Sequence, residues 1–236
     1  MTHSPLLESV MKPLLAVQPA YRHDNQEASP KFAGSCFRLW VKNHFLTAAH
    51  CLEGIESTDI SVFDYVQEKY LKCHKIYTHP HADLAIIEVE GRGADQLENF
   101  RLTDVDFSFG ENVHCFGWLT EEDNLKLPAR VIGGIIQRPF IHREGKYETP
   151  ALEYSSPIPK GMSGGPAFSA RYNDIAIGVA IGTIKSSVVV SEYTDYEDEK
   201  KKESEKISEI VRYGVILRLF ELREWITETL PRSNQQ

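Results

Sequence analysis

The sequence lacks the marks of several broad protein classes. No apolar run reaches the ~18 residues that a membrane-spanning helix needs. The 236 residues include only four cysteines, too few for a disulfide-built scaffold, and their fifteen glycines and twelve prolines fit neither collagen nor low-complexity chains. Basic residues are also scarce, with 26 Lys and Arg against 34 Asp and Glu and a net charge of -8. Because phosphate backbones need clustered cations, we expect neither nucleic-acid nor membrane partners.

Residues 1–21 are not typical of an export signal. They carry no early cluster of cations, and Glu8 and Lys12 interrupt their apolar stretch. The apolar side chains follow helical spacing, which predicts a short amphipathic N-terminal helix. They are Leu6, Leu7, Val10, Met11, Leu14 and Leu15. We therefore expect a protein that stays in the compartment where it is made, the cytoplasm.

Short apolar or alternating runs, separated by Gly, Pro, Asn, Asp or charged clusters, recur through most of the chain. They are residues 36–41, 44–49, 59–66, 83–89, 111–118, 130–137, 175–184 and 209–219. Many short strands with turn signals between them predict an all-β protein, either a sandwich or barrels. A C-terminal helix is predicted where the spacing becomes helical, with Leu219, Leu222, Trp225, Ile226 and Leu230 on one face.

One segment stands apart from these runs. Residues 191–206 are almost wholly polar and charged. Such a segment buries too little apolar area to order itself, which predicts a solvated, mobile surface loop.

A zinc site is one alternative that the residue types leave open. Cys73, His74, His79 and His81 lie close together in the sequence. Their spacing is not the paired Cys-x-x-Cys framework of structural zinc sites, so we expect no metal and no other cofactor.

Three short patterns contain residue types that carry chemistry. His50 ends an apolar strand after the small residues Thr-Ala-Ala, which leave an imidazole room to reach a partner. Asp83 opens a strongly apolar strand, where a partly buried carboxylate needs a donor such as a histidine N–H. Ser163 stands among glycines, which let main-chain N–H groups converge on a substrate carbonyl. Taken singly, each residue also has a structural explanation, such as a turn cap for the aspartate.

Taken together and in this order, the patterns resemble the trypsin-like (chymotrypsin-fold) serine proteases, in their compact bacterial form. The motifs are Thr-Ala-Ala-His-Cys at His50, Asp-Leu-Ala-Ile-Ile at Asp83 and Gly-Met-Ser-Gly-Gly-Pro at Ser163. The resemblance runs from Gly34 to Leu230 and implies two antiparallel six-stranded β-barrels with a C-terminal helix. We divide the chain into a lead segment at 1–30, barrels at 31–108 and 109–218, and a helix and tail at 219–236.

The resemblance also implies a role for each site residue. Ser163 would be the nucleophile, His50 the general base and Asp83 the group that orients it, with the N–H groups of Gly161 and Ser163 as the oxyanion hole. The remaining positions would form the primary specificity pocket. Its base would be Pro157 and Ile158, its mouth Lys160, one wall Ile181, Gly182 and Thr183, and another wall Gly214. With no acid at the base, the pocket disfavours Arg and Lys and suits a small or apolar side chain.

Two features bear on control of this implied site. Met162 stands where digestive members of the family carry an acid that pairs with a newly cut N-terminus, so we expect no activation switch of that kind. Cys36 and Cys51 fall where many members place a disulfide, but a reducing cytoplasm would keep them as thiols.

The function that these features favour is an intracellular serine endopeptidase that acts on protein or peptide substrates, under the control of a signal or a regulatory partner protein. A catalytically silent binding module of the same fold is the alternative. A lid or docking role for residues 191–206 also stays open.

Overall fold

The structure is a computed structural model. It describes residues 17–24, 29–65, 67–91, 101–104, 106–107, 109–119, 129–172, 175–197 and 200–231, with the backbone alone over 195–204. The predicted N-terminal helix lies outside these residues. No helix within the described ranges is long and apolar enough to cross a membrane.

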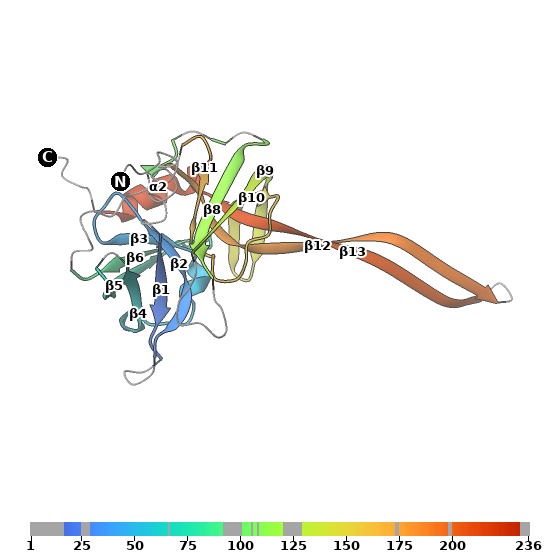
Figure 1. Cartoon of the computed structure of the whole chain (residues 1–236), viewed down its shortest axis with the longest axis horizontal. Coiled ribbons are helices and arrows are strands. Elements are labelled where there is room, and N and C mark those ends of the chain that lie inside the picture. Colours follow the sequence, from blue (N-terminus) through green and yellow to red (C-terminus); the bar gives the residue numbers. More distant parts are fainter. Residues whose placement is uncertain are drawn as a thin grey trace, which may run out of the picture.

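The first half of the described chain forms a closed antiparallel barrel (Figure 1). Its strands, in spatial order, are β1 (Val17–Arg22), β2 (Lys31–Arg38), β3 (His44–Thr47), β6 (Ala85–Val89), β5 (Lys69–Thr78) and β4 (Ile60–Asp64). Two short 3-10 helices, η1 (Ala49–Leu52) and η2 (Ser57–Asp59), connect β3 to β4. Strand β1 lies inside the predicted lead segment, so the barrel begins at Val17 rather than at residue 31, because β1 pairs with both β2 and β4.

The second half forms a ring of six antiparallel strands. Their spatial order is β11 (Pro166–Ser169), β8 (Asn112–Trp118), β9 (Ala129–Glu144), β10 (Tyr147–Tyr154), β13 (Lys200–Arg218) and β12 (Ile175–Glu197), and pairing of β11 with β12 closes the ring. The short strand β7 (Arg101–Leu102) adds to β12 in parallel. Helix α2 (Leu219–Thr229) follows β13 and buries Leu219, Leu222 and Ile226. The predicted architecture of two six-stranded barrels and a C-terminal helix is thereby confirmed.

Two clusters of buried apolar side chains form the core of the protein. The larger cluster fills the first barrel and extends to β12, β13 and α2. The smaller one fills the second barrel around Tyr154, whose hydroxyl donates to the main-chain carbonyls of Val113 (3.1 Å) and Ile132 (2.7 Å). Burial of a tyrosine is inexpensive when its hydroxyl has such partners. The site described below lies where the two barrels meet.

Strands β12 and β13 continue far beyond the second barrel as a two-stranded ribbon, drawn in orange and red in Figure 1. We call this ribbon, residues 184–213, the arm. The prediction of a loop over 191–206 is therefore wrong, since the described residues of this segment pair as strands in the outer part of the arm. The β-branched and aromatic residues between Val188 and Tyr193 favour extended backbone, and a cross-strand ion pair joins Glu192 to Lys206 at 3.0 Å. Strand pairing satisfies the backbone groups between the two strands, but a two-stranded ribbon without a buried apolar face is only marginally stable by itself.

Candidate active site

His50 and Asp83 meet on the first barrel through two hydrogen bonds. The imidazole Nδ1 of His50 donates to Asp83 Oδ2 at 2.6 Å, and the main-chain N–H of His50 donates to Asp83 Oδ1 at 2.8 Å. Asp83 is buried, 4% exposed, so its carboxylate depends on these donors. Both arise locally, because η1 begins two residues after the end of β3 and Asp83 lies two residues before β6, the neighbour of β3 in the barrel. The structure thus brings together two of the three residues that the motifs singled out.

The charge state of His50 is set by competing effects. Burial alone lowers the pKa of the imidazolium, but the hydrogen bonds to Asp83 and Cys51 outweigh burial and raise that pKa to about 10. Protonated His50 cannot accept a proton from a serine hydroxyl. The free site is therefore expected to hold its base in the inactive, charged form at neutral pH.

A residue of the second barrel holds the main chain of Asp83 in place. The Asp83 N–H donates to Thr149 Oγ1 on β10 at 3.0 Å, and both residues are buried. Beside them, the Glu148 N–H donates to the carbonyl of His81 at 2.8 Å. These bonds tie the β10 edge to the aspartate loop across the interface between the barrels. Nothing in the local sequence around Thr149 marked it as a site residue.

Replacing Thr149 with Val is expected to slow fluorophosphonate labelling of Ser163 about tenfold and to lower the free energy of unfolding by about 1–3 kcal/mol, because the buried Asp83 N–H loses its acceptor. Labelling rate with a fluorophosphonate probe and unfolding in urea measure the two effects. Thr149→Ser keeps the hydroxyl and serves as the control. A Val variant that labels as fast as the Ser variant would contradict a positioning role.

Ser163 lies on a tight turn that is anchored to the first barrel. Its carbonyl accepts the N–H of Ser35 at 2.8 Å. The Ser35 hydroxyl donates to the Gly161 carbonyl at 2.9 Å and accepts the N–H of Trp118 at 2.8 Å. Gly161 has a φ of 101°, and within the described ranges neither its N–H nor that of Ser163 donates a hydrogen bond. Both donors are therefore free to bind an oxyanion, and Ser35 is a second positioning residue that the sequence did not reveal.

The serine hydroxyl does not contact the histidine in this structure. Ser163 Oγ donates to the main-chain carbonyl of Ile181 on β12 at 3.1 Å. The Sγ atom of Cys51 lies 3.7 Å from His50 Nε2 and 3.6 Å from the Ser163 carbonyl oxygen. Ser163 would thus have to turn its hydroxyl away from Ile181 before His50 could accept its proton.

All four cysteines are free and buried. The Cys36 thiol donates to the carbonyl of Gln18 at 3.3 Å, within the first barrel. The Cys51 Sγ also lies close to Gly34 of strand β2, where an added Cβ would be 2.5 Å away. Cys36 and Cys51, where many members of the family place a disulfide, are thus separate thiols in this structure.

The raised pKa of His50 predicts an unusual pH profile. The rate of fluorophosphonate labelling should still climb between about pH 7 and about pH 9, above the ordinary imidazole range near 6.5. Cys51→Ala removes one of the two groups that raise this pKa, so the rising limb should move to lower pH by up to about one unit. Cys115→Ala, a buried thiol remote from His50, is the control. If the rising limb of the pH profile stays at the same pH in Cys51→Ala, Cys51 does not raise the pKa of His50 and the prediction is wrong.

The residues predicted for the specificity pocket gather beside Ser163. The hydroxyl of Thr183 donates to the Ile158 carbonyl at 2.8 Å and accepts the Ile158 N–H at 2.7 Å, so it joins two walls directly. A Cβ on Gly214 would lie 3.0 Å from a side-chain carbon of Ile158, which brings the third wall into contact. Ile158 is 4% exposed, whereas Pro157 and Lys160 are exposed, so Pro157 does not lie at an enclosed base.

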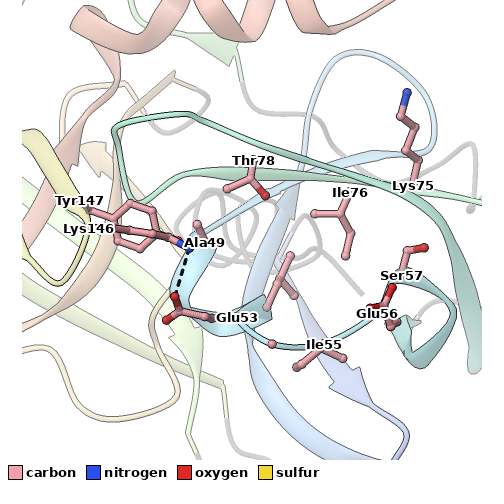
Figure 2. A pocket seen from close by; sticks show the side chains of 12 residues that line it. Ala49, Glu53, Ile55, Glu56, Ser57, Lys75, Ile76, Thr78, Lys146 and Tyr147 are labelled. Carbon is pink, nitrogen blue, oxygen red and sulfur yellow. Dashed lines mark ion pairs between the residues drawn. The ribbon is translucent and has the colours of Figure 1, made fainter.

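Two clefts lie near the candidate site. One, of about 380 Å³, is lined by η1, the segment that leads to η2, part of β5 and the β9–β10 turn, and the Lys146–Glu53 ion pair of 3.2 Å lies at one end of it (Figure 2). The other, of about 280 Å³, is lined by Ile181, Gly182 and Thr183 together with Ile184, Val215 and the end of β9. One predicted wall of the pocket therefore borders an open cleft on β12.

The zinc alternative concerned four residues, Cys73, His74, His79 and His81. Among the described residues, the structure shows no group of three or more His, Cys, Asp or Glu side chains that could hold a metal ion, so these four do not form a metal site there.

Met162 is fully buried in the second-barrel cluster, against Gly117 of β8. Its position next to Ser163 is thus held by apolar packing.

Two antiparallel barrels, with a His–Asp pair on one and a glycine-flanked serine turn on the other, define the trypsin-like class of serine proteases. A family model bears this out: residues 34–179 match the trypsin-like peptidase domain, and the chain belongs to that family. No curated protein matches the chain.

Solved structures share the fold at low identity. The active form of the Rv3671c protease from M. tuberculosis is 15% identical, with a TM-score of 0.66 and coverage of 98% of this chain and 90% of that one. The protease domain of MamO from Magnetospirillum magneticum is 17% identical, with a TM-score of 0.63 and coverage of 94% and 99%. The HtrA-type protease AlgW, solved with a decapeptide, is 15% identical, with a TM-score of 0.61 and coverage of 96% and 68%.

Proposed function

We propose that the protein is a serine endopeptidase in which His50, Asp83 and Ser163 form the catalytic triad. The observation that carries the proposal is the buried Asp83 carboxylate, which accepts both the Nδ1–H and the main-chain N–H of His50. This pair fixes the imidazole tautomer and leaves Nε2 to act as a base. The serine turn supports the same conclusion, because the N–H groups of Gly161 and Ser163 on this turn are both free to bind an oxyanion.

The reaction follows from these positions. Ser163 turns its hydroxyl from Ile181 to His50 Nε2, and His50 takes the proton as Oγ bonds to the scissile carbonyl carbon. The oxyanion that forms is bound by the N–H groups of Gly161 and Ser163. His50 then delivers the proton to the leaving amine as the carbon–nitrogen bond breaks. A water molecule, deprotonated by His50, then attacks the carbonyl carbon of the acyl-enzyme, and the bond to Ser163 Oγ breaks as His50 returns the proton to Ser163.

The substrate and setting are part of the same proposal. Thr183 joins Ile158 across the pocket, and the predicted pocket positions include no acid, which favours small or apolar side chains over Arg and Lys. Glu144 lines the adjoining cleft but pairs with His142 at 3.2 Å. Because Met162 packs in an apolar core, we propose control by a signal or partner protein rather than by an N-terminal ion pair. Four free thiols are typical of a reducing compartment and support a cytoplasmic location.

A fluorophosphonate probe tests the activity directly. The intact protein should be labelled, and Ser163→Ala should abolish labelling while the fold persists. Ser169→Ala changes a serine in the same barrel and is the control for general effects. A proteome-wide comparison of cleavage sites, intact protein against Ser163→Ala, then identifies the preferred side chain. Equal labelling of both proteins would contradict the role of Ser163.

A catalytically silent binding module is the second candidate, and two contacts favour it. The Ser163 hydroxyl is held by Ile181 O, and Thr183 closes the pocket onto Ile158. A silent module should stay unlabelled over the whole pH range in which the protein is folded, whereas a protease held in check should be labelled as the pH rises and His50 loses its proton.

A further inference from the structure

The arm leaves one edge of strand β12 open. Within the described ranges, β12 pairs with β7 and β11 only from Ile175 to Val179, and its last partner on that side is Gly165, bonded to Ala180. From Ile181 to Glu197 the outer edge has no neighbouring strand there. Open edges of this length are ready to pair with another strand, and proteins usually protect them with proline or dense charge. This stretch of β12 contains no proline.

The open edge is also unusually apolar. Val188, Val189 and Val190 are each 50–56% exposed, and Tyr193 is 65% exposed. A run of three exposed valines on an isolated ribbon stabilises nothing in the single chain. Contiguous exposed apolar residues of this kind mark an interaction site.

A β-bulge determines which side chains share a face. Val189 pairs with Ser208 and Ser191 pairs with Ile207, so Val190 is an extra residue in β12. Lys185 and Glu192 lie an odd number of positions apart in the sequence, so on a regular strand their side chains would point to opposite faces. The bulge places both on the face of Arg212 and Lys206, their partners on β13. It likewise places Ile184 and Tyr193 together on the other face.

With that register, the edge is complementary to itself. We propose that two copies of this chain pair antiparallel along β12, about a two-fold axis at Val188. The axis sets Val188 opposite Val188 of the second copy and Ser187 opposite Val189. With Val190 bulged in both copies, the outer positions then match Ser186 with Ser191, Lys185 with Glu192, and Ile184 with Tyr193. Opposite charges and apolar side chains facing each other are the cross-strand pairs that stabilise sheets.

The other edge of the arm offers no opposite-charge match of this kind near its centre. A two-fold axis at Ile207 of β13 opposes Glu205 to Glu209, one at Glu209 opposes Lys206 to Arg212, and axes at Ser208 or Ile210 set no opposite charges against each other. Like charges directly opposite each other destabilise a strand pair. The mixture of both signs along the arm also fits a second copy better than a partner of a single charge. The two-fold contact uses the β12 edge of both copies and leaves only the β13 edges, which lack this charge match, so we expect a dimer.

The pairing would bring the second copy to the candidate site. Thr194 of the second copy falls opposite Thr183, the residue that clasps Ile158 in the predicted pocket. Each arm would therefore end beside the cleft that Ile181, Gly182 and Thr183 line on the other copy. The dimer stands apart from the proposed activity, since its existence is measured without any substrate.

Exchange of charges tests the register. Sedimentation of full-length Ser163→Ala protein should show a dimer, which Lys185→Glu or Glu192→Lys weakens about tenfold or more, because each variant makes two like-charge pairs. The double variant should restore it. Lys206→Glu breaks the same intra-arm ion pair as Glu192→Lys and should leave the dimer intact. A monomer at every concentration, or singles that behave as the double does, would overturn the proposal.

Cross-linking tests the axis. Val188→Cys should form a disulfide-linked dimer under mild oxidation, because paired residues across antiparallel strands have Cα atoms about 4.5–5.5 Å apart, within disulfide range. Ile210→Cys is equally exposed on the same arm, but lies on β13, roughly 14 Å from its counterpart across two intervening strands. It should not cross-link, and the native thiols are buried. Equal cross-linking of both variants would refute pairing along β12.

Discussion

Asp83→Asn is expected to slow acylation of Ser163 by about 10⁴-fold while leaving the fold intact. The carboxylate accepts two hydrogen bonds from His50, one from the main-chain N–H and one from Nδ1–H. An amide has one oxygen to accept and must turn its NH₂ group toward the other donor. If the NH₂ group faces Nδ1, the imidazole proton moves to Nε2, and the ring can no longer take a proton from Ser163.

The rate of fluorophosphonate labelling measures this loss, and circular dichroism with urea unfolding checks the fold. Loss of the negative charge also removes the main cause that raises the pKa of His50, so the residual rate should reach its plateau at lower pH than in the parent protein. Asp106→Asn is the matched control, since Asp106 pairs with Arg218 at the surface. Labelling of the Asp83 variant within tenfold of the parent would contradict the assigned role.

Features that are local in the sequence explain which contact could be predicted. His50 follows one apolar strand and Asp83 precedes another, and these strands are neighbours in the barrel. The two motifs were therefore enough to predict that the two residues meet. Thr149 could not be found this way. It reaches Asp83 across the interface between the barrels, and its own segment shows only an ordinary strand pattern.

Two other differences have physical causes of the same kind. Gly34 and Cys36 point to the same face of β2, and only the packing of η1 against that strand sets the Cys51 thiol against Gly34. In the arm, the polar composition of residues 191–206 suggested a loop because polar residues predict low burial. Whether a ribbon forms depends instead on pairing between its two strands, and the polarity of one strand does not predict that pairing.

Gly164→Ala is expected to destabilise the protein by about 3–5 kcal/mol and to abolish labelling of Ser163. Gly164 has a φ of 87°, and an added Cβ would lie 2.0 Å from the Ser35 carbonyl oxygen and 2.2 Å from Thr47 Oγ1. The carbonyl belongs to the main chain of β2, so no side-chain rotation relieves the clash. The serine turn would have to move away from the first barrel and break the Ser35–Ser163 hydrogen bond.

Gly54→Ala separates the two contributions to this effect. Gly54 has a similar φ of 72°, but an added Cβ there has no heavy atom within 4 Å. Its substitution should cost only the backbone strain, about 1–2 kcal/mol, and leave the labelling rate unchanged. Urea unfolding and probe labelling of both variants give the comparison. If Gly164→Ala and Gly54→Ala lower the free energy of unfolding by the same amount, the close approach of the serine turn to β2 and β3 does not hold Ser163 in place, and the prediction is wrong.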